Sequence, residues 1–78
     1  MVTVRLFAAA AEAAGIEQAS VAPGTASQIG DQLIGVQGDE LARVWRQCAL
    51  MVDGRMVEAD EVIAAGSTLD VLPPFAGG

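Results

Sequence analysis

The carboxyl end of the chain carries the residues best suited to chemistry. It runs from Leu72 to Gly78 and reads LPPFAGG. Gly77 and Gly78 have no Cβ atoms, so a partner backbone can approach them closely and their bonds can adopt conformations forbidden to other residues. A free carboxylate is a poor electrophile, but a partner can convert that of Gly78 to an acyl-adenylate with a good leaving group. The alternative is a frayed end without function, since chain termini are often disordered.

The rest of the chain offers little catalytic chemistry. It has no His, no Lys and one cysteine, Cys48, so it lacks the usual inventory for nucleophilic or general-base catalysis. Cys48 cannot form an internal disulfide, and no Cys or His residues cluster at metal-ligand spacing. We therefore expect no metal site, no bound cofactor, no enzymatic activity of the chain alone, and a reduced, cytoplasmic setting.

Composition and charge narrow the class of protein and partner. With 53% hydrophobic and 18% charged residues among 78, the chain is too apolar to be disordered and long enough for one domain. Its formal charge of -6 argues against a nucleic-acid partner, because clustered cations are needed to neutralise phosphates. The opening MVTVRLF has no positive leader, and no apolar stretch approaches the roughly 18 to 20 residues of a membrane span. A basic protein partner is favoured, and a membrane is not.

The hydrophobic pattern predicts one domain, residues 1–74, followed by a flexible tail, residues 75–78. Strand-like alternation, helix formers and turn residues succeed one another along the domain. The expected elements are a strand at 2–8, one or two helical turns at 9–14, a strand at 17–22, a main helix after Thr25, a short helix at 39–47, a hairpin of 48–52 and 55–58, and a last strand at 68–72. This order predicts an α+β fold of the ubiquitin-like β-grasp type, a mixed sheet with the main helix across one face.

The main helix has a start signal and an apolar stripe. Thr25 can cap its first turn, and Ile29, Leu33 and Val36 recur on one face. Gly30 weakens the helix by about 1 kcal/mol relative to Ala, so the helix depends on packing against the sheet.

The hairpin and the last strand also have clear signals. Asp53-Gly54 suits the positive φ angles of a tight two-residue turn, which places Met51 opposite Met56 on the outward face. The two methionines either extend a partner-binding patch or fill gaps in a small core. Pro73-Pro74 must end the last strand, because proline has no amide donor for a ladder.

These segments resemble the MoaD/ThiS sulfur-carrier family, most closely the small subunits of molybdopterin synthase. The terminal LPPFAGG is similar to the family's terminal signature, residues 4–8 to its opening strand and residues 52–57 to its hairpin. Asp60, Ile63 and Gly66 are similar to the lead into its last strand. Pro73-Pro74 is the most discriminating feature, since other di-glycine carriers have it less often.

The resemblance implies a chemistry for Gly78. An adenylating enzyme of the ubiquitin-activating type would use ATP to attach AMP to Gly78, and a sulfur donor would replace AMP to leave a thiocarboxylate. The tail would then enter the large subunit of molybdopterin synthase and pass its sulfur to a cyclic pyranopterin phosphate. The acid, base and phosphate-binding groups would belong to the large subunit.

Two aromatic residues are expected to anchor the partner. Phe7 lies on the polar face of the first strand by parity, and Phe75 lies beyond the last strand, where it exposes apolar area unless a partner covers it. The other tail residues expected to bind the partner are Pro73, Pro74 and Ala76. A second small cluster that buries Phe7 is the competing interpretation.

Other functions remain open from the sequence. The chain could be a sulfur carrier for thiamin or cysteine biosynthesis, a ubiquitin-like protein modifier that forms isopeptides on target lysines, or an inert interaction module that never uses its tail.

Overall fold

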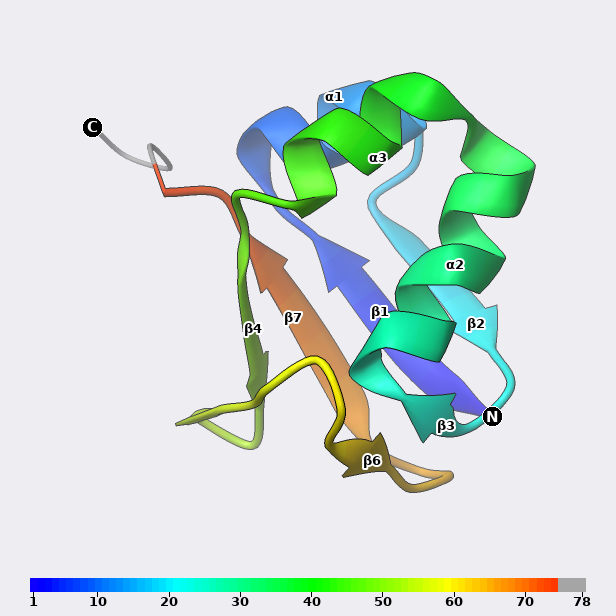
Figure 1. Cartoon of the computed structure of the whole chain (residues 1–78), viewed down its shortest axis with the longest axis vertical. Helices are drawn as coiled ribbons and strands as arrows, with labels where there is room; N and C mark the ends of the chain where they lie inside the picture. The colour runs from blue at the N-terminus through cyan, green and yellow to red at the C-terminus, as the bar shows by residue number, and fades with distance from the viewer. Residues whose placement is uncertain (75–78) are drawn as a thin grey trace.

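The computed structural model describes residues 1–74, which form a mixed sheet with three helices over one face (Figure 1). The elements are β1 (Val2–Leu6), α1 (Ala8–Ala14), β2 (Gln18–Val21), β3 (Gly24–Thr25), α2 (Ala26–Gln37), α3 (Asp39–Trp45), β4 (Ala49–Val52), β5 (Arg55–Met56), β6 (Val62–Ile63) and β7 (Thr68–Leu72). The main sheet has the order β2-β1-β7-β4-β5, with β1 parallel to β7 and the other pairs antiparallel. This is the α+β architecture predicted from the order of elements.

The core lies between the sheet and the helices. Alternate residues of β1 and β7 point toward the helices and are buried, as the alternation in the sequence predicts. The largest fully buried side chains are Ile29, Leu41, Leu69, Val2, Val4 and Val71. Because the first and last strands lie side by side, the core depends on a pairing between the two ends of the described domain.

The first strand is shorter than expected. It ends at Leu6, because helix α1 already begins at Ala8. Phe7 is the extended residue between them, and its carbonyl accepts a hydrogen bond of 3.0 Å from the Ala10 N–H in the first turn of the helix. The helix ends at Gly15, as predicted, in the left-handed conformation with φ of 74°.

Helix α2 begins as predicted but its apolar stripe is shorter. Thr25 Oγ1 accepts from the Gln28 N–H at 3.1 Å, and Gln28 Oε1 accepts from the Thr25 N–H at 2.9 Å, which forms a capping box. Ile29 and Leu33 are buried. The prediction for Val36 is wrong: its side chain is 78% exposed, because the last turn of α2 runs past the sheet (Figure 1).

Gly30 in the middle of α2 has a packing role. A Cβ atom built at Gly30 would lie 2.8 Å from Cε2 of the Trp45 indole, so the absence of a side chain lets α3 bring Trp45 against α2. Trp45 is half-buried and packs against the core. The glycine that weakens the isolated helix therefore permits its contact with α3.

The β4–β5 hairpin forms as predicted. Asp53 and Gly54 have φ angles of 53° and 77°, and Met51 is opposite Met56. A second sheet, formed by the two-residue strands β3 and β6, is absent from the prediction. It fastens the loop after the hairpin to the start of α2, where the Ala26 N–H donates to the Glu61 carbonyl at 3.0 Å.

Candidate functional site

The site predicted from the sequence begins where β7 ends. Leu72 is the last strand residue and pairs with Ala49 of β4. Pro73 is buried and Pro74 is exposed, so Pro74 presents more surface to a partner than Pro73 does. The remaining predicted site residues, Phe75, Ala76, Gly77 and Gly78, lie outside the described residues. The described part of the chain therefore ends directly after the last strand, at residues 72–74, which we call the tail root.

The tail root adjoins the face of the sheet that the helices do not cover, here called the outer face. The residues on this face lie at the strand positions that point away from the helices, together with Phe7, which follows β1. They are Thr3, Arg5, Phe7, Gln18, Ser20, Ala49, Met51, Met56, Thr68, Asp70 and Leu72. The register arranges them in rows across the strands. The row next to the tail root is apolar and contains Phe7, Leu72 and Ala49, whereas the row at the opposite end contains hydroxyl-bearing Ser20, Thr3 and Thr68.

Phe7 lies on the outer face beside the tail root. The Phe7 N–H donates to the Val71 carbonyl at 3.2 Å, which holds the residue next to Leu72. Its side chain is 37% exposed, so no second cluster buries it. The Arg5 guanidinium carbon lies 5.6 Å from the ring centroid, within the range of a cation–π contact. Phe7 thus provides an aromatic surface near the tail root.

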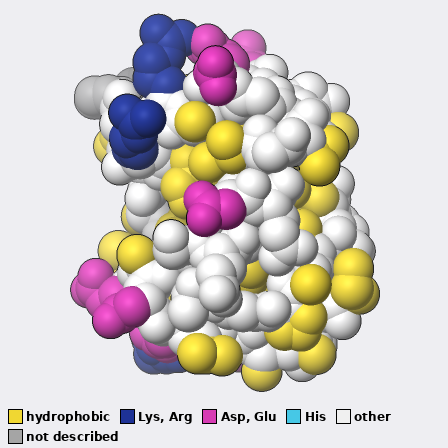
Figure 2. All heavy atoms as spheres, turned by 45° about the vertical axis from the view of Figure 1, so that its right-hand side comes forward, with side chains coloured by type: hydrophobic (Ala, Val, Ile, Leu, Met, Phe, Trp, Pro, Cys, Tyr) yellow, Lys and Arg dark blue, Asp and Glu magenta, His cyan; other side chains and the backbone are white. Residues whose placement is uncertain are grey.

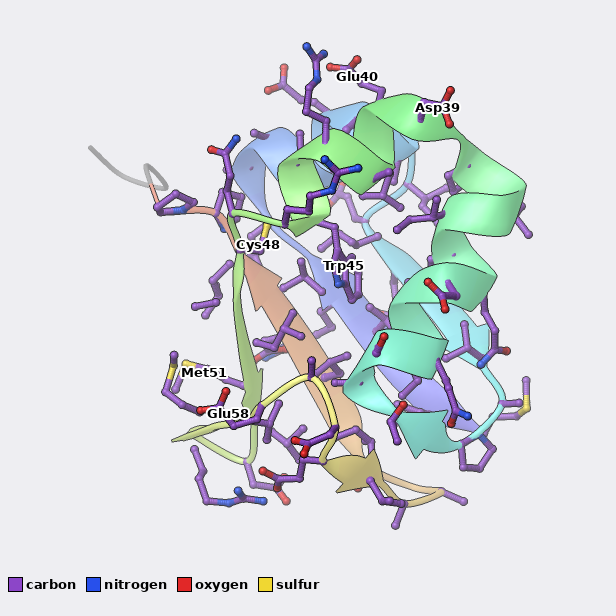
Figure 3. The ribbon with its side chains drawn as sticks, in the orientation of Figure 1. Asp39, Glu40, Trp45, Cys48, Met51 and Glu58 are labelled. Atoms are coloured by element: carbon purple, nitrogen blue, oxygen red, sulfur yellow. The ribbon has the colours of Figure 1, made fainter. Side chains whose placement is uncertain are left out.

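Met51 and Met56 extend this apolar surface. Met56 is 61% exposed and Met51 is half-buried, and Figure 3 shows Met51 pointing away from the helices. Neither residue belongs to the buried core, so the interpretation that they fill gaps in it is wrong.

Cys48 is not placed as a reactive group. It lies between the end of α3 and the start of β4 (Figure 3), and its thiol donates to the Val44 carbonyl at 3.3 Å. Burial raises the pKa of the Cys48 thiol, which lowers the fraction of thiolate. Its surroundings are those of a small half-buried hydrophobic residue.

The side of the molecule that carries the helices has a hollow between α2 and α3 beside Trp45, and a second hollow on the other side of Trp45 lies against β4 and β5. Residues shared by both hollows are Trp45, Arg46, Leu50 and Ala59. Figure 2 shows apolar side chains exposed on this side among arginines and acidic groups. Within residues 1–74, no three His, Cys, Asp or Glu side chains are grouped to hold a metal ion, and no helix is both long and apolar enough to cross a membrane.

Comparisons with known proteins agree with this geometry. A model of the ThiS family matches residues 4–78. The structure of SAMP1 from Haloferax volcanii, the small archaeal modifier protein 1, is 28% identical with a TM-score of 0.78 over 99% of this chain and 98% of that one. A sequence search against curated proteins finds no significant match.

Two further structures share the fold at lower identity. A putative molybdopterin converting factor subunit 1 from Pyrococcus furiosus is 18% identical, with a TM-score of 0.75 over 94% of this chain and 95% of that one. In the complex of subunits 1 and 2 of the molybdopterin-converting factor from Helicobacter pylori, the matching chain is 19% identical, with a TM-score of 0.67 over 99% and 97% of the two chains.

Proposed function

Because this chain belongs to the MoaD/ThiS family of sulfur carriers, we propose that it carries sulfur on Gly78 for the synthesis of molybdopterin. The observation that carries the proposal is the extent of the family match, which runs through Gly78 and so includes the residue proposed to react. The structure supports it by ending the last strand at Leu72, six positions before Gly78 in the sequence.

The proposed cycle uses the tail as a substrate of other enzymes. An adenylating enzyme of the ubiquitin-activating type joins the Gly78 carboxylate to the α-phosphate of ATP and releases pyrophosphate. A sulfur donor then displaces AMP and leaves a thiocarboxylate. The thiocarboxylate sulfur bonds to a cyclic pyranopterin phosphate in place of an oxygen substituent, which gives a thioester with Gly78. Water then hydrolyses this thioester, so the sulfur stays on the pterin, the Gly78 carboxylate is regenerated and the chain is recovered unchanged.

The partner proposed for the transfer step is the large subunit of molybdopterin synthase. The related chain from Helicobacter pylori is in a complex with subunit 2 of its converting factor, which supports a partner of this class. The apolar row beside the tail root gives such a partner a surface to bind while it receives the tail.

The first test is the mass of the C-terminal peptide. After incubation with the adenylating enzyme, ATP and a sulfide source, we expect mass spectrometry to find one oxygen replaced by sulfur in the terminal residue. Omission of ATP is the control and should leave the peptide unchanged. If sulfur is incorporated elsewhere or not at all, the chain is not a carrier of this kind.

A second prediction concerns the aromatic anchors. Phe7→Ala and Phe75→Ala should each weaken binding to the large subunit by about 2 kcal/mol, because buried aromatic anchors dominate interfaces. Calorimetric titration measures the affinities, and Thr3→Ala at the polar end of the outer face is a matched control. Denaturant melts should place Phe7→Ala near the parent, since the ring is already 37% exposed. Normal binding by a poorly folded Phe7→Ala would make Phe7 a core residue instead.

A protein modifier is the second candidate, because the 28% identical relative from Haloferax volcanii is called a small archaeal modifier protein. Both functions begin with adenylation of Gly78 and differ in the acceptor. A modifier forms an isopeptide bond with a lysine of a target protein, whereas a carrier ends as a thiocarboxylate. Lysines of cellular proteins that carry the C-terminal segment of this chain in an isopeptide bond would favour the modifier.

A further inference from the structure

The outer face contains one charged pair among uncharged residues. Arg5 and Asp70 are opposite each other in the parallel register of β1 and β7. Arg5 Nε donates to Oδ1 at 2.7 Å and Nη2 to Oδ2 at 2.9 Å, the bidentate arrangement in which both oxygens are used. The carboxylate of Asp70 raises the pKa of Arg5, so the guanidinium stays charged. Each charge is therefore neutralised within this chain.

The neighbours of the pair are the apolar residues of the same face. Phe7 lies under the Arg5 guanidinium, 5.6 Å away, and Met51 pairs with Asp70 on the other side. Leu72 of the tail root is two residues beyond Asp70 on the same strand and the same face. A partner that holds the tail root and covers Phe7 consequently also covers the pair, whose side chains are still 50% and 25% exposed.

Resting on the proposed function, we propose that the Arg5–Asp70 pair stays closed in the complex with the large subunit and meets an uncharged, apolar surface of that partner. A charge on the partner opposite the pair would compete with a two-bond contact in which the charges of Arg5 and Asp70 already offset each other. An unpaired charge in the covered interface is costly, whereas a paired one can be covered at a much smaller cost. The pair therefore selects against partners with a formal charge at this position.

A double-mutant cycle tests this role. The variants are Arg5→Met, Asp70→Leu and the double variant, each titrated against the large subunit from the same organism. Each single variant leaves one charge uncompensated and should bind about 30-fold more weakly or worse. The double variant should return to within about threefold of the parent, because neutral residues of similar size replace a closed pair.

A second ion pair provides the matched control. Arg55 Nη2 lies 2.6 Å from Glu61 Oε2, and Arg55 is opposite Val52, off the outer face. Arg55→Met changes the net charge as Arg5→Met does but should leave the affinity unchanged. Denaturant melts should differ little among all variants, since these pairs are exposed to solvent.

Several results would overturn the inference. Additive losses in the double variant would mean that each charge contacts the partner separately. Single variants that bind like the parent would place the pair outside the interface. If the parent itself does not bind the large subunit, the proposed function fails, and that result is distinct from either outcome of the cycle.

Discussion

Deletion of Gly77 and Gly78 is expected to abolish sulfur transfer while leaving the free energy of unfolding nearly unchanged. The carboxylate that accepts AMP would then sit two residues too early and on Ala76, whose side chain hinders entry into a narrow site. The buried hydrophobic core of the described domain lies between Val2 and Val71, so the deletion removes none of it. Synthesis of molybdopterin from purified components measures the first effect, and a denaturant melt measures the second.

A variant of the same length separates the effect of tail length from the effect of side chains at positions 77 and 78. Replacing Gly77 and Gly78 with alanines keeps the carboxylate in place but adds two Cβ atoms. We expect this variant to be adenylated far more slowly than the parent and to melt like it. A large fall in melting temperature after the deletion would mean that Gly77 and Gly78 stabilise the domain, contrary to this prediction.

Leu69→Ala is expected to destabilise the domain by about 2 to 5 kcal/mol, the usual cost of emptying a fully buried leucine site. Leu69 is 0% exposed and lies between Val4 of β1 and Val52 of β4. Small domains have total stabilities of about 5 to 15 kcal/mol, and short chains have little surplus. A large fraction of Leu69→Ala should thus be unfolded in mild denaturant, as measured by circular dichroism.

The matched control is Val36→Ala, which shortens an aliphatic side chain that is 78% exposed. Its effect on the free energy of unfolding should stay within about 0.5 kcal/mol. If both variants lost the same free energy of unfolding, Val36 would be buried, and the apolar stripe of α2 would extend to Val36 after all.

Local signals in the sequence predict most of this fold. Pro73-Pro74 predicts the end of the last strand at Leu72, Thr25 predicts the start of α2, and Asp53-Gly54 predicts the hairpin with its methionine pair. Each signal depends on residues within one turn or strand. By contrast, β3 and β6 have two residues each, too few for any periodicity to be read.

Features that depend on contacts between residues far apart in the sequence cannot be predicted from such local signals. Gly30 looks like a helix defect until Trp45 is packed against it. Arg5 and Asp70 are 65 positions apart, and only the parallel register brings them together. For the candidate site, residue types alone single out Gly77 and Gly78 and strand parity places Phe7, but the burial of Pro73 depends on the folded surroundings.

The parallel contact between β1 and β7 also determines how the domain resists mechanical force. Figure 1 shows the start of β1 at one end of the sheet and the end of β7 at the other. Tension applied between these two points pulls the strands past each other in shear, so the ladder bonds share the load and do not open one at a time. A force that separates these two points must therefore break the pairing of β1 with β7 at the centre of the sheet first. We expect the domain to resist mechanical unfolding when it is pulled in this direction.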